Sequence, residues 1–144
     1  MIRALTSLLL TLALLTCIPD SSLASYQGAR FQARRILQAA RGQGFAVRSY
    51  YTQGLLARGQ STILRFTLTS GVNYKIVVGG CEDCYDIDAA LYDEYGNYID
   101  SDRDATAIAI VNNTPKWTGT FYLKVTMYNS TYNGAHYVVQ YAYY

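Results

Sequence analysis

The sequence is poor in the residue types on which most enzymes depend. Its 144 residues include 1 histidine, 1 tryptophan, 2 prolines and 3 cysteines. No Gly-x-Ser-x-Gly, His-Glu-x-x-His or phosphate-binding glycine loop accompanies the lone His136. A histidine without an identifiable nucleophile gives no mechanism, so we expect a protein that is not an enzyme and has no catalytic residues.

Acidic residues are missing from most of the chain. Every aspartate and glutamate except Asp20 lies between Glu82 and Asp104, and none follows Asp104. Residues 25–48 contain arginine as their only charged residue type. Nucleic-acid binding needs a basic stripe on the folded domain itself, so this distribution predicts no nucleic-acid partner.

A long hydrophobic run occurs only at the N-terminus. Arg3 precedes an apolar run over residues 4–16, and Ser22 and Ala24 are the small residues at the positions that a signal peptidase reads. We therefore predict a signal peptide over residues 1–24, cleaved near Ala24, and secretion to the periplasm or the extracellular space. The run is shorter than the roughly 20 residues that span a bilayer, so we expect no transmembrane span in the mature chain. Lipidation at Cys17 is the alternative, because residues 14–17 resemble a lipoprotein cleavage box.

The predicted cleavage would leave two cysteines, Cys81 and Cys84. Because the compartment outside the cytoplasm is oxidising, we predict a short local disulfide between them. A redox dithiol and half of a zinc site are the alternatives. The residues after Cys84 lack a helical pattern, and no second Cys or His pair is present, so the disulfide is favoured.

Residues 25–44 form a lead segment with helical periodicity. The pattern predicts a basic amphipathic helix over residues 25–43, which Gly42 and Gly44 end. We expect this helix to lie on the outside of the domain; contact with a membrane or with the acidic residues is the alternative. The apolar stripe consists of Tyr26, Ala29, Ala33, Ile36, Leu37 and Ala40.

From residue 45 onward the pattern is that of strands. Short runs of β-branched and aromatic residues alternate with Gly, Asn, Asp and Pro turns, and no helical pattern intervenes. Residues 45–144 are therefore predicted to form one all-β domain, an antiparallel jelly-roll-like β-sandwich of about eight strands. The expected strands are 46–52, 62–69, 73–78, 87–93, 98–101, 106–111, 118–127 and 135–143.

Aspartates recur at alternating positions in two short segments. Calcium takes six to eight oxygen ligands of this kind. The second segment lacks the glycine and the closing glutamate of an EF-hand loop, so any calcium site must be assembled across two loops. Exposed, solubilising loops with arginine-paired aspartates, Arg103 among them, are the alternative. The alternating candidates are Asp86, Asp88, Asp100, Asp102 and Asp104.

Tyrosine is unusually frequent, with 15 residues. Tyr92, Tyr95 and Tyr98 bracket the turn at Gly96 and Asn97, and a tyrosine can bury its ring face while its hydroxyl stays in water. We predict that these tyrosines form a binding surface for sugar stacking or self-association. The alternative is that they only cover the faces and edges of the sheets.

Residues 54–143 resemble the bacterial pre-peptidase C-terminal domain. The resemblance lies in Asp-x-Asp at Asp86 and Asp88, in Asp93 before the Gly-Asn turn, and in the Thr-Gly-Thr-Phe-Tyr motif at residues 118–122. It implies a small, noncatalytic sandwich attached to secreted peptidases or other exported enzymes, which in some relatives binds calcium and collagen or polysaccharide. It also implies that Asp86, Asp88 and Asp93 organise loops or ligate calcium.

These observations lead to two functional hypotheses. The first is a secreted, noncatalytic binding or accessory module, stabilised by calcium, that contacts an extracellular protein or polysaccharide. The second is an extracellular structural subunit that assembles with itself into a filament or surface layer. In that case tyrosine-rich strand edges and the basic helix would meet the acidic segment of the next copy.

Overall fold

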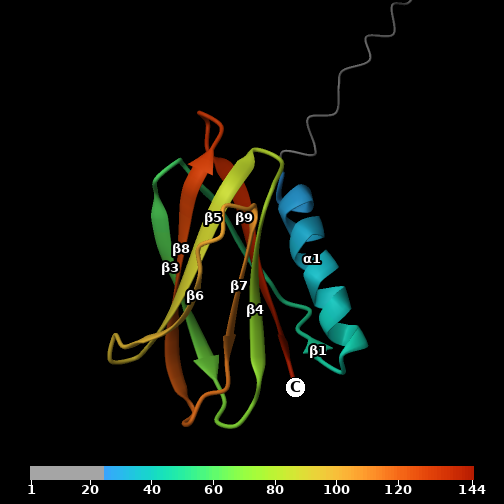
Figure 1. The fold of residues 1–144 in the computed structure, drawn as a ribbon, viewed down its shortest axis with the longest axis vertical. Helices are drawn as coiled ribbons and strands as arrows, with labels where there is room; N and C mark the ends of the chain where they lie inside the picture. The colour runs from blue at the N-terminus through green and yellow to red at the C-terminus, as the bar shows by residue number, and fades with distance from the viewer. Residues whose placement is uncertain (1–24) are drawn as a thin grey trace, which may run out of the picture.

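The computed structural model describes residues 25–144, which form a β-sandwich with one helix against it (Figure 1). The predicted signal peptide and Cys17 lie outside the described residues. The elements are α1 (Tyr26–Gly42), β1 (Ala46–Val47), β2 (Thr52–Leu56), β3 (Ser61–Leu68), β4 (Tyr74–Gly80), β5 (Cys84–Asp93), β6 (Tyr98–Asp102), β7 (Ile108–Asn113), β8 (Gly119–Ser130) and β9 (Ala135–Tyr143).

The strands form two sheets, and the strand pairs are antiparallel. Sheet A has the order β1-β9-β4-β7, with β2 also paired to β9, and sheet B has the order β3-β8-β5-β6. The predicted antiparallel β-sandwich preceded by one helix is therefore confirmed. No helix among residues 25–144 combines the length and the hydrophobicity that crossing a bilayer demands.

The first predicted strand is wrong in one respect, because residues 46–52 do not form a continuous strand. β1 and β2 both pair with β9, and the chain leaves the ladder between them. There the side-chain Nε2 of Gln140 donates to the carbonyl oxygen of Arg48 at 2.5 Å, and the Arg48 N–H donates to the carbonyl of Tyr141 at 3.0 Å. The hydrogen bond from the Gln140 side chain thus replaces one backbone hydrogen bond of the ladder.

The core between the sheets follows from alternation along the strands. On β8, Phe121, Leu123, Val125 and Met127 are fully buried, while the residues between them are exposed or half-buried. Each such buried side chain contributes roughly 1.5–3 kcal/mol relative to an exposed one. Their partners in the same core include Leu68, Ile76, Val78, Ile87, Leu91, Val111 and Val139.

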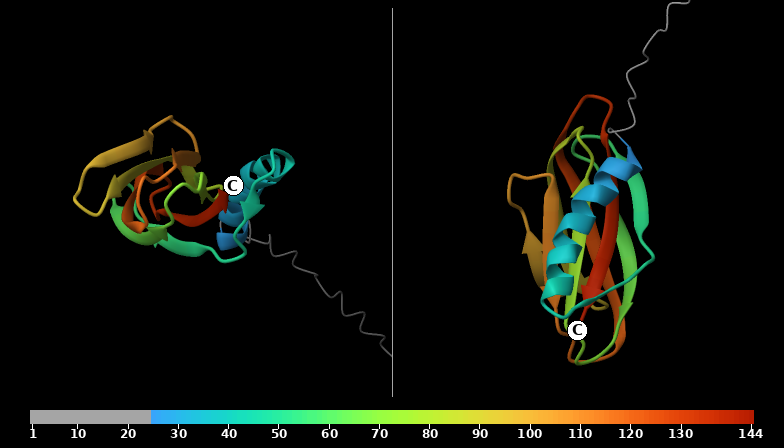
Figure 2. Two further views of the ribbon diagram at one scale, coloured as in Figure 1. Left: turned by 90° about the horizontal axis from the view of Figure 1, so that it is seen from below. Right: turned by 90° about the vertical axis from the view of Figure 1, so that its right-hand side faces the viewer.

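Strand β4 is buried on both faces, because sheet A lies between sheet B and α1 (Figure 2). Ile76 and Val78 join the core between the sheets, whereas Val77 packs against the helix with Ala33 and Leu37. Helix α1 comes very close to β4 at Gly79, where a Cβ would lie 2.5 Å from the carbonyl oxygen of Ala29. The alanine-rich stripe of the helix is therefore a packing surface against sheet A.

The tyrosine-rich last strand is not at an edge of a sheet. Strand β9 pairs with β4 on one side and with β1 and β2 on the other. The strand edge on which the self-assembly hypothesis relied is thus already occupied within the molecule. Self-assembly through other surfaces stays a prediction.

We predict that Gly79→Ala loosens α1 from sheet A. The added methyl group would collide with backbone atoms of the helix, and overpacking of this kind costs about 1–3 kcal/mol. Thermal denaturation should show a lower melting temperature. Gly42→Ala is the matched control, because a Cβ at Gly42 meets nothing within 4 Å. Equal melting temperatures of the wild-type protein and the Gly79→Ala variant would contradict this account of the packing.

Candidate binding surface

The two sheets differ in what covers their outer faces. Helix α1 packs on sheet A, whereas no element of residues 25–144 lies over the outer face of sheet B (Figures 1 and 2). Large apolar side chains nevertheless point outward from sheet B, among them Ile63, which is 66% exposed, and Tyr122, which is 36% exposed. Large apolar groups on an uncovered face are typical of an interaction surface.

A hollow of about 580 Å³ lies on this face beside the β5–β6 hairpin. Its apolar wall comes from three strands and the hairpin turn: Ile63 from β3, Tyr92 from β5, Tyr122 from β8 and Tyr95 from the turn. Ligand sites in proteins commonly have volumes of about 300–1,000 Å³, so the hollow can take a sugar ring or a protein side chain. Asp93, Glu94, Gly96 and Lys124 complete the lining.

Asp93 fixes the shape of the hairpin turn. Its Oδ1 accepts from the backbone N–H of Tyr95 at 2.9 Å and of Asn97 at 2.8 Å, and its Oδ2 accepts from the Asn97 side chain at 2.9 Å. Burial opposes the charged form, but the hydrogen bonds from Asn97, Tyr95 and Gly96 outweigh it and lower the pKa of Asp93. The carboxylate therefore organises the loop, as the family resemblance implies.

Of the three predicted tyrosines at the hairpin, two line the hollow and one lies outside it. Tyr92 and Tyr95 line the hollow, whereas Tyr98 stacks edge-on against Tyr92 with ring centroids 6.2 Å apart. Ile63, Tyr122 and Lys124 were not among the predicted surface residues. Their outward positions follow from alternation along their strands, but their meeting with the hairpin depends on the pairing of β3 with β8 and of β8 with β5.

Asp100 and Asp102 satisfy the free edge of sheet A. The Oδ2 atom of Asp100 accepts from the Asn112 N–H at 2.7 Å, and the Oδ2 atom of Asp102 accepts from the Ile110 N–H at 2.9 Å. These are outward-facing amide groups of β7, the last strand of sheet A. The alternating aspartates of β6 thus replace a neighbouring strand. Both carboxylates therefore serve as acceptors for backbone amides.

Asp86 and Asp88 lie on β5, where their surroundings disfavour the charged form of each carboxyl group. Burial raises the pKa of Asp86, and burial followed by the charge of Asp86 raises the pKa of Asp88, while Arg103 acts in the opposite direction. Asp88 lies with Arg103 and Lys124 in a hollow of about 240 Å³. The structure therefore places Asp88 close to basic side chains.

The six candidate ligands do not form one metal site. Among residues 25–144, no group of three or more His, Cys, Asp or Glu side chains is arranged to hold a metal ion. Asp93 is committed to the hairpin, and Asp104 is exposed after the end of β6. This donor set does not fit a calcium ion with six to eight oxygen ligands taken from the protein alone. Calcium binding stays a prediction for Asp86 and Asp88.

The predicted disulfide is not formed in the structure, where Cys81 and Cys84 are buried free thiols. A turn brings the two residues together, because the Cys84 N–H donates to the Cys81 carbonyl at 2.9 Å. That turn holds the segment without a bond between the sulfurs. Burial, followed by the charge of Cys81, raises the pKa of Cys84 to about 12, so its thiol is a poor nucleophile at neutral pH. A disulfide formed after export stays a prediction.

Comparisons with known proteins support the fold. A scan against models of protein families and a search of curated proteins find no match. The pre-peptidase C-terminal domain of a collagenase from Bacillus anthracis is similar in structure, with a TM-score of 0.51 and 21% identity over 64% of this chain and 87% of that domain. A periplasmic inhibitor of g-type lysozyme from Aeromonas hydrophila also has a TM-score of 0.51, with 10% identity over 69% of this chain and 89% of the inhibitor.

At these identities the likeness concerns the fold alone. The resemblance to the pre-peptidase C-terminal domain, which rested on a few motifs, is confirmed at that level. The same architecture in a lysozyme inhibitor shows that one sandwich can serve unrelated tasks, so function must be argued from the surface of this chain.

We predict that Asp100→Ala together with Asp102→Ala exposes the edge of β7. Each lost hydrogen bond should cost roughly 1 kcal/mol, and the amide protons of Ile110 and Asn112 should exchange faster with deuterated water. Asp104→Ala is the control, because it removes a nearby carboxylate that caps neither amide. Unchanged exchange at Ile110 and Asn112 in the double variant would show that the two carboxylates do not protect the edge.

Proposed function

We propose that this protein is a secreted, noncatalytic binding module that contacts an extracellular polysaccharide or protein through the outer face of sheet B. The hollow of about 580 Å³ beside the β5–β6 hairpin carries the proposal. It combines aromatic and aliphatic walls with a few polar groups, and it lies on the sheet face that the described chain leaves uncovered. Exposed aromatic residues in such a hollow are the usual anchors of binding energy.

Rigid support makes the hollow suitable for binding. The turn that carries Tyr95 is fixed by the three hydrogen bonds of the Asp93 carboxylate, and Trp117 bonds to Glu94 through Nε1 at 3.2 Å. Trp117 also stacks on Phe121, a fully buried residue, with ring centroids 5.8 Å apart. A surface that is ordered before binding loses little conformational entropy when the partner arrives.

Two considerations support a noncatalytic and secreted role. The described surface has no nucleophile paired with a base: His136 is half-buried against the ring of Tyr26, with ring centroids 4.2 Å apart. The similar solved structures include a domain of a collagenase and a periplasmic inhibitor. The inhibitor is a periplasmic protein, and the N-terminal sequence of this chain predicts export.

The proposal predicts that Tyr95→Ala combined with Tyr122→Ala weakens partner binding. Removal of two aromatic anchors should weaken affinity by about tenfold or more. Cosedimentation with insoluble collagen and with chitin, and binding to immobilised g-type lysozyme, would identify which kind of partner is bound.

The control is Tyr50→Ala combined with Tyr132→Ala. These tyrosines are 72% and 96% exposed but do not line the hollow, so the variant loses the same atoms elsewhere on the surface. The proposal requires the control to bind as the wild-type protein does. Equal loss in both variants, or binding to none of the probes, would count against the outer face of sheet B.

We further propose that calcium, if it stabilises this module, acts at Asp86 and Asp88. The Oδ1 atom of Asp86 is buried without a hydrogen-bond partner among the described residues, and the pKa values of both carboxyl groups are raised. A cation shared by these two groups would relieve their repulsion, with water supplying the remaining ligands.

Calcium at this pair should raise the melting temperature by mass action, and Asp86→Asn should remove the increase. Asp104→Asn, which makes the same change outside the pair, should keep it. Melting curves of the wild-type protein that coincide in calcium and in chelator would eliminate the metal from the proposal and leave the tyrosine surface unaffected.

A further inference from the structure

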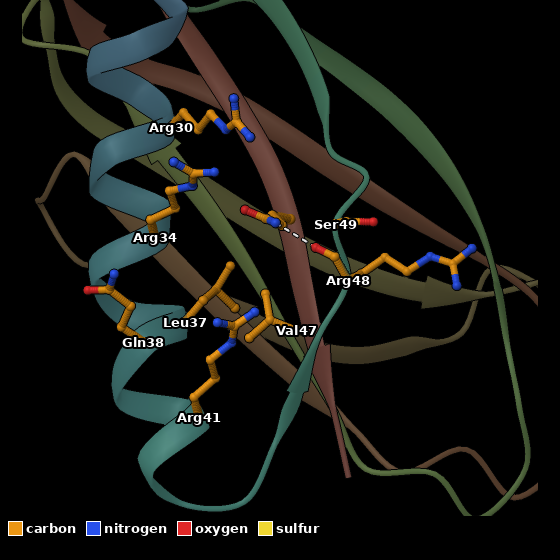
Figure 3. A pocket seen from close by; sticks show the side chains of 9 residues that line it. Arg30, Arg34, Leu37, Gln38, Arg41, Val47, Arg48 and Ser49 are labelled. Carbon is orange, nitrogen blue, oxygen red and sulfur yellow. Dashed lines mark hydrogen bonds between the residues drawn. The ribbon is translucent and has the colours of Figure 1, made fainter.

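A second cleft, of about 380 Å³, lies on the opposite side of the molecule from the tyrosine surface. It runs between α1 and the chain that connects β1 to β2, where the strand leaves the ladder with β9. Figure 3 shows the side chains of Arg30, Arg34 and Arg41 reaching from the helix into this gap, whereas the side chain of Arg48 points away from it. The cleft is thus lined by cationic groups that come from one face of one helix.

Among residues 25–144, no carboxylate lies beside these arginines in the cleft. Helix α1 contains no acidic residue, and no carboxylate lines the cleft. The side chains of Arg34 and Arg41 form no ion pair or hydrogen bond with any residue in the described part of the chain. Like charges four residues apart on a helix repel each other, and Arg30 and Arg34 stand in that relation. An anion in the cleft would relieve this repulsion.

Two buried polar atoms in the cleft also lack partners. Gln140 is 5% exposed, and while its Nε2 bonds to the Arg48 carbonyl, its Oε1 accepts no hydrogen bond from a described residue. The Nε atom of Arg30 is likewise buried and unpaired, and the guanidinium carbon of Arg30 lies 4.3 Å from the centroid of the Tyr51 ring. The site therefore presents an unused acceptor and an unused donor in addition to its positive charge.

We propose that this cleft binds an acidic saccharide, a sugar ring that carries a carboxylate beside free hydroxyl groups. The planar guanidinium groups match a carboxylate with paired hydrogen bonds, and a sugar hydroxyl can donate to the Oε1 atom of Gln140. An aspartate or glutamate side chain of another protein brings the anion but no hydroxyl donor. The volume of the cleft suits one or two sugar rings. This site is independent of the tyrosine surface.

The test is a calorimetric titration of the protein with trigalacturonate, with the neutral trisaccharide of galactose and with sodium sulfate. Trigalacturonate should bind more tightly than either of the other two. Arg34→Gln should weaken the binding of trigalacturonate by about tenfold. Gln140→Met should weaken the binding of trigalacturonate but leave the binding of sulfate unchanged. Cooperative melting curves should show that each variant is folded.

Arg35→Gln is the matched control, because Arg35 is exposed on the same helix, bonds to Gln32 and does not line the cleft. Arg35→Gln should leave the affinity for trigalacturonate unchanged. Equal weakening by Arg34→Gln and Arg35→Gln would overturn the proposal in favour of a diffuse positive field. Sulfate that binds as tightly as trigalacturonate would overturn the saccharide assignment. A dimer that forms at low salt and is lost in Arg34→Gln would assign the cleft to an acidic surface of a second copy.

Discussion

The burial of β4 on both of its faces is the constraint on which the rest of the structure depends. Ile76 and Val78 fill the space between the sheets, while Val77 and the bare backbone of Gly79 receive α1 on the other side. Because α1 contacts the backbone of β4 where Gly79 has no side chain, the helix is held in position along sheet A. Its arginines are then held beside the interruption between β1 and β2, and sheet B is left without a cover. The arginine-lined cleft and the uncovered tyrosine surface both follow from this one packing arrangement.

The clustering of acidic residues has a structural explanation that does not require a metal ion. Asp93 holds the hairpin turn, and Asp100 and Asp102 serve backbone amides of β7. A carboxylate offers two oxygens with several acceptor positions, so a single residue can satisfy amides from two segments at once. Asp86 and Asp88 are the exceptions, because burial and mutual repulsion oppose their charge. The same short stretch of sequence thus contains both structural acceptors and the carboxylates that a cation would help most.

Periodicity in the sequence was sufficient to predict the fold class, the helix and most of the strands, because local alternation determines which face is buried. It could not predict the break between β1 and β2, which is closed by a side-chain bond between residues 92 positions apart. The sequence places Tyr92 and Tyr95 beside the hairpin turn, whereas Ile63 and Tyr122 reach the same hollow only through strand pairing. The alternating aspartates led to the prediction of a calcium site. The local sequence does not reveal that backbone amides of β7 lie opposite Asp100 and Asp102.

The capped edge of β7 limits how this molecule can exchange strands with other chains. Open sheet edges invite β-augmentation by extended peptides, domain swapping and amyloid growth. Here an incoming strand would have to displace the carboxylates of Asp100 and Asp102 and place its own carbonyl groups beside two negative charges. One side of the larger sheet is therefore closed to cross-β association.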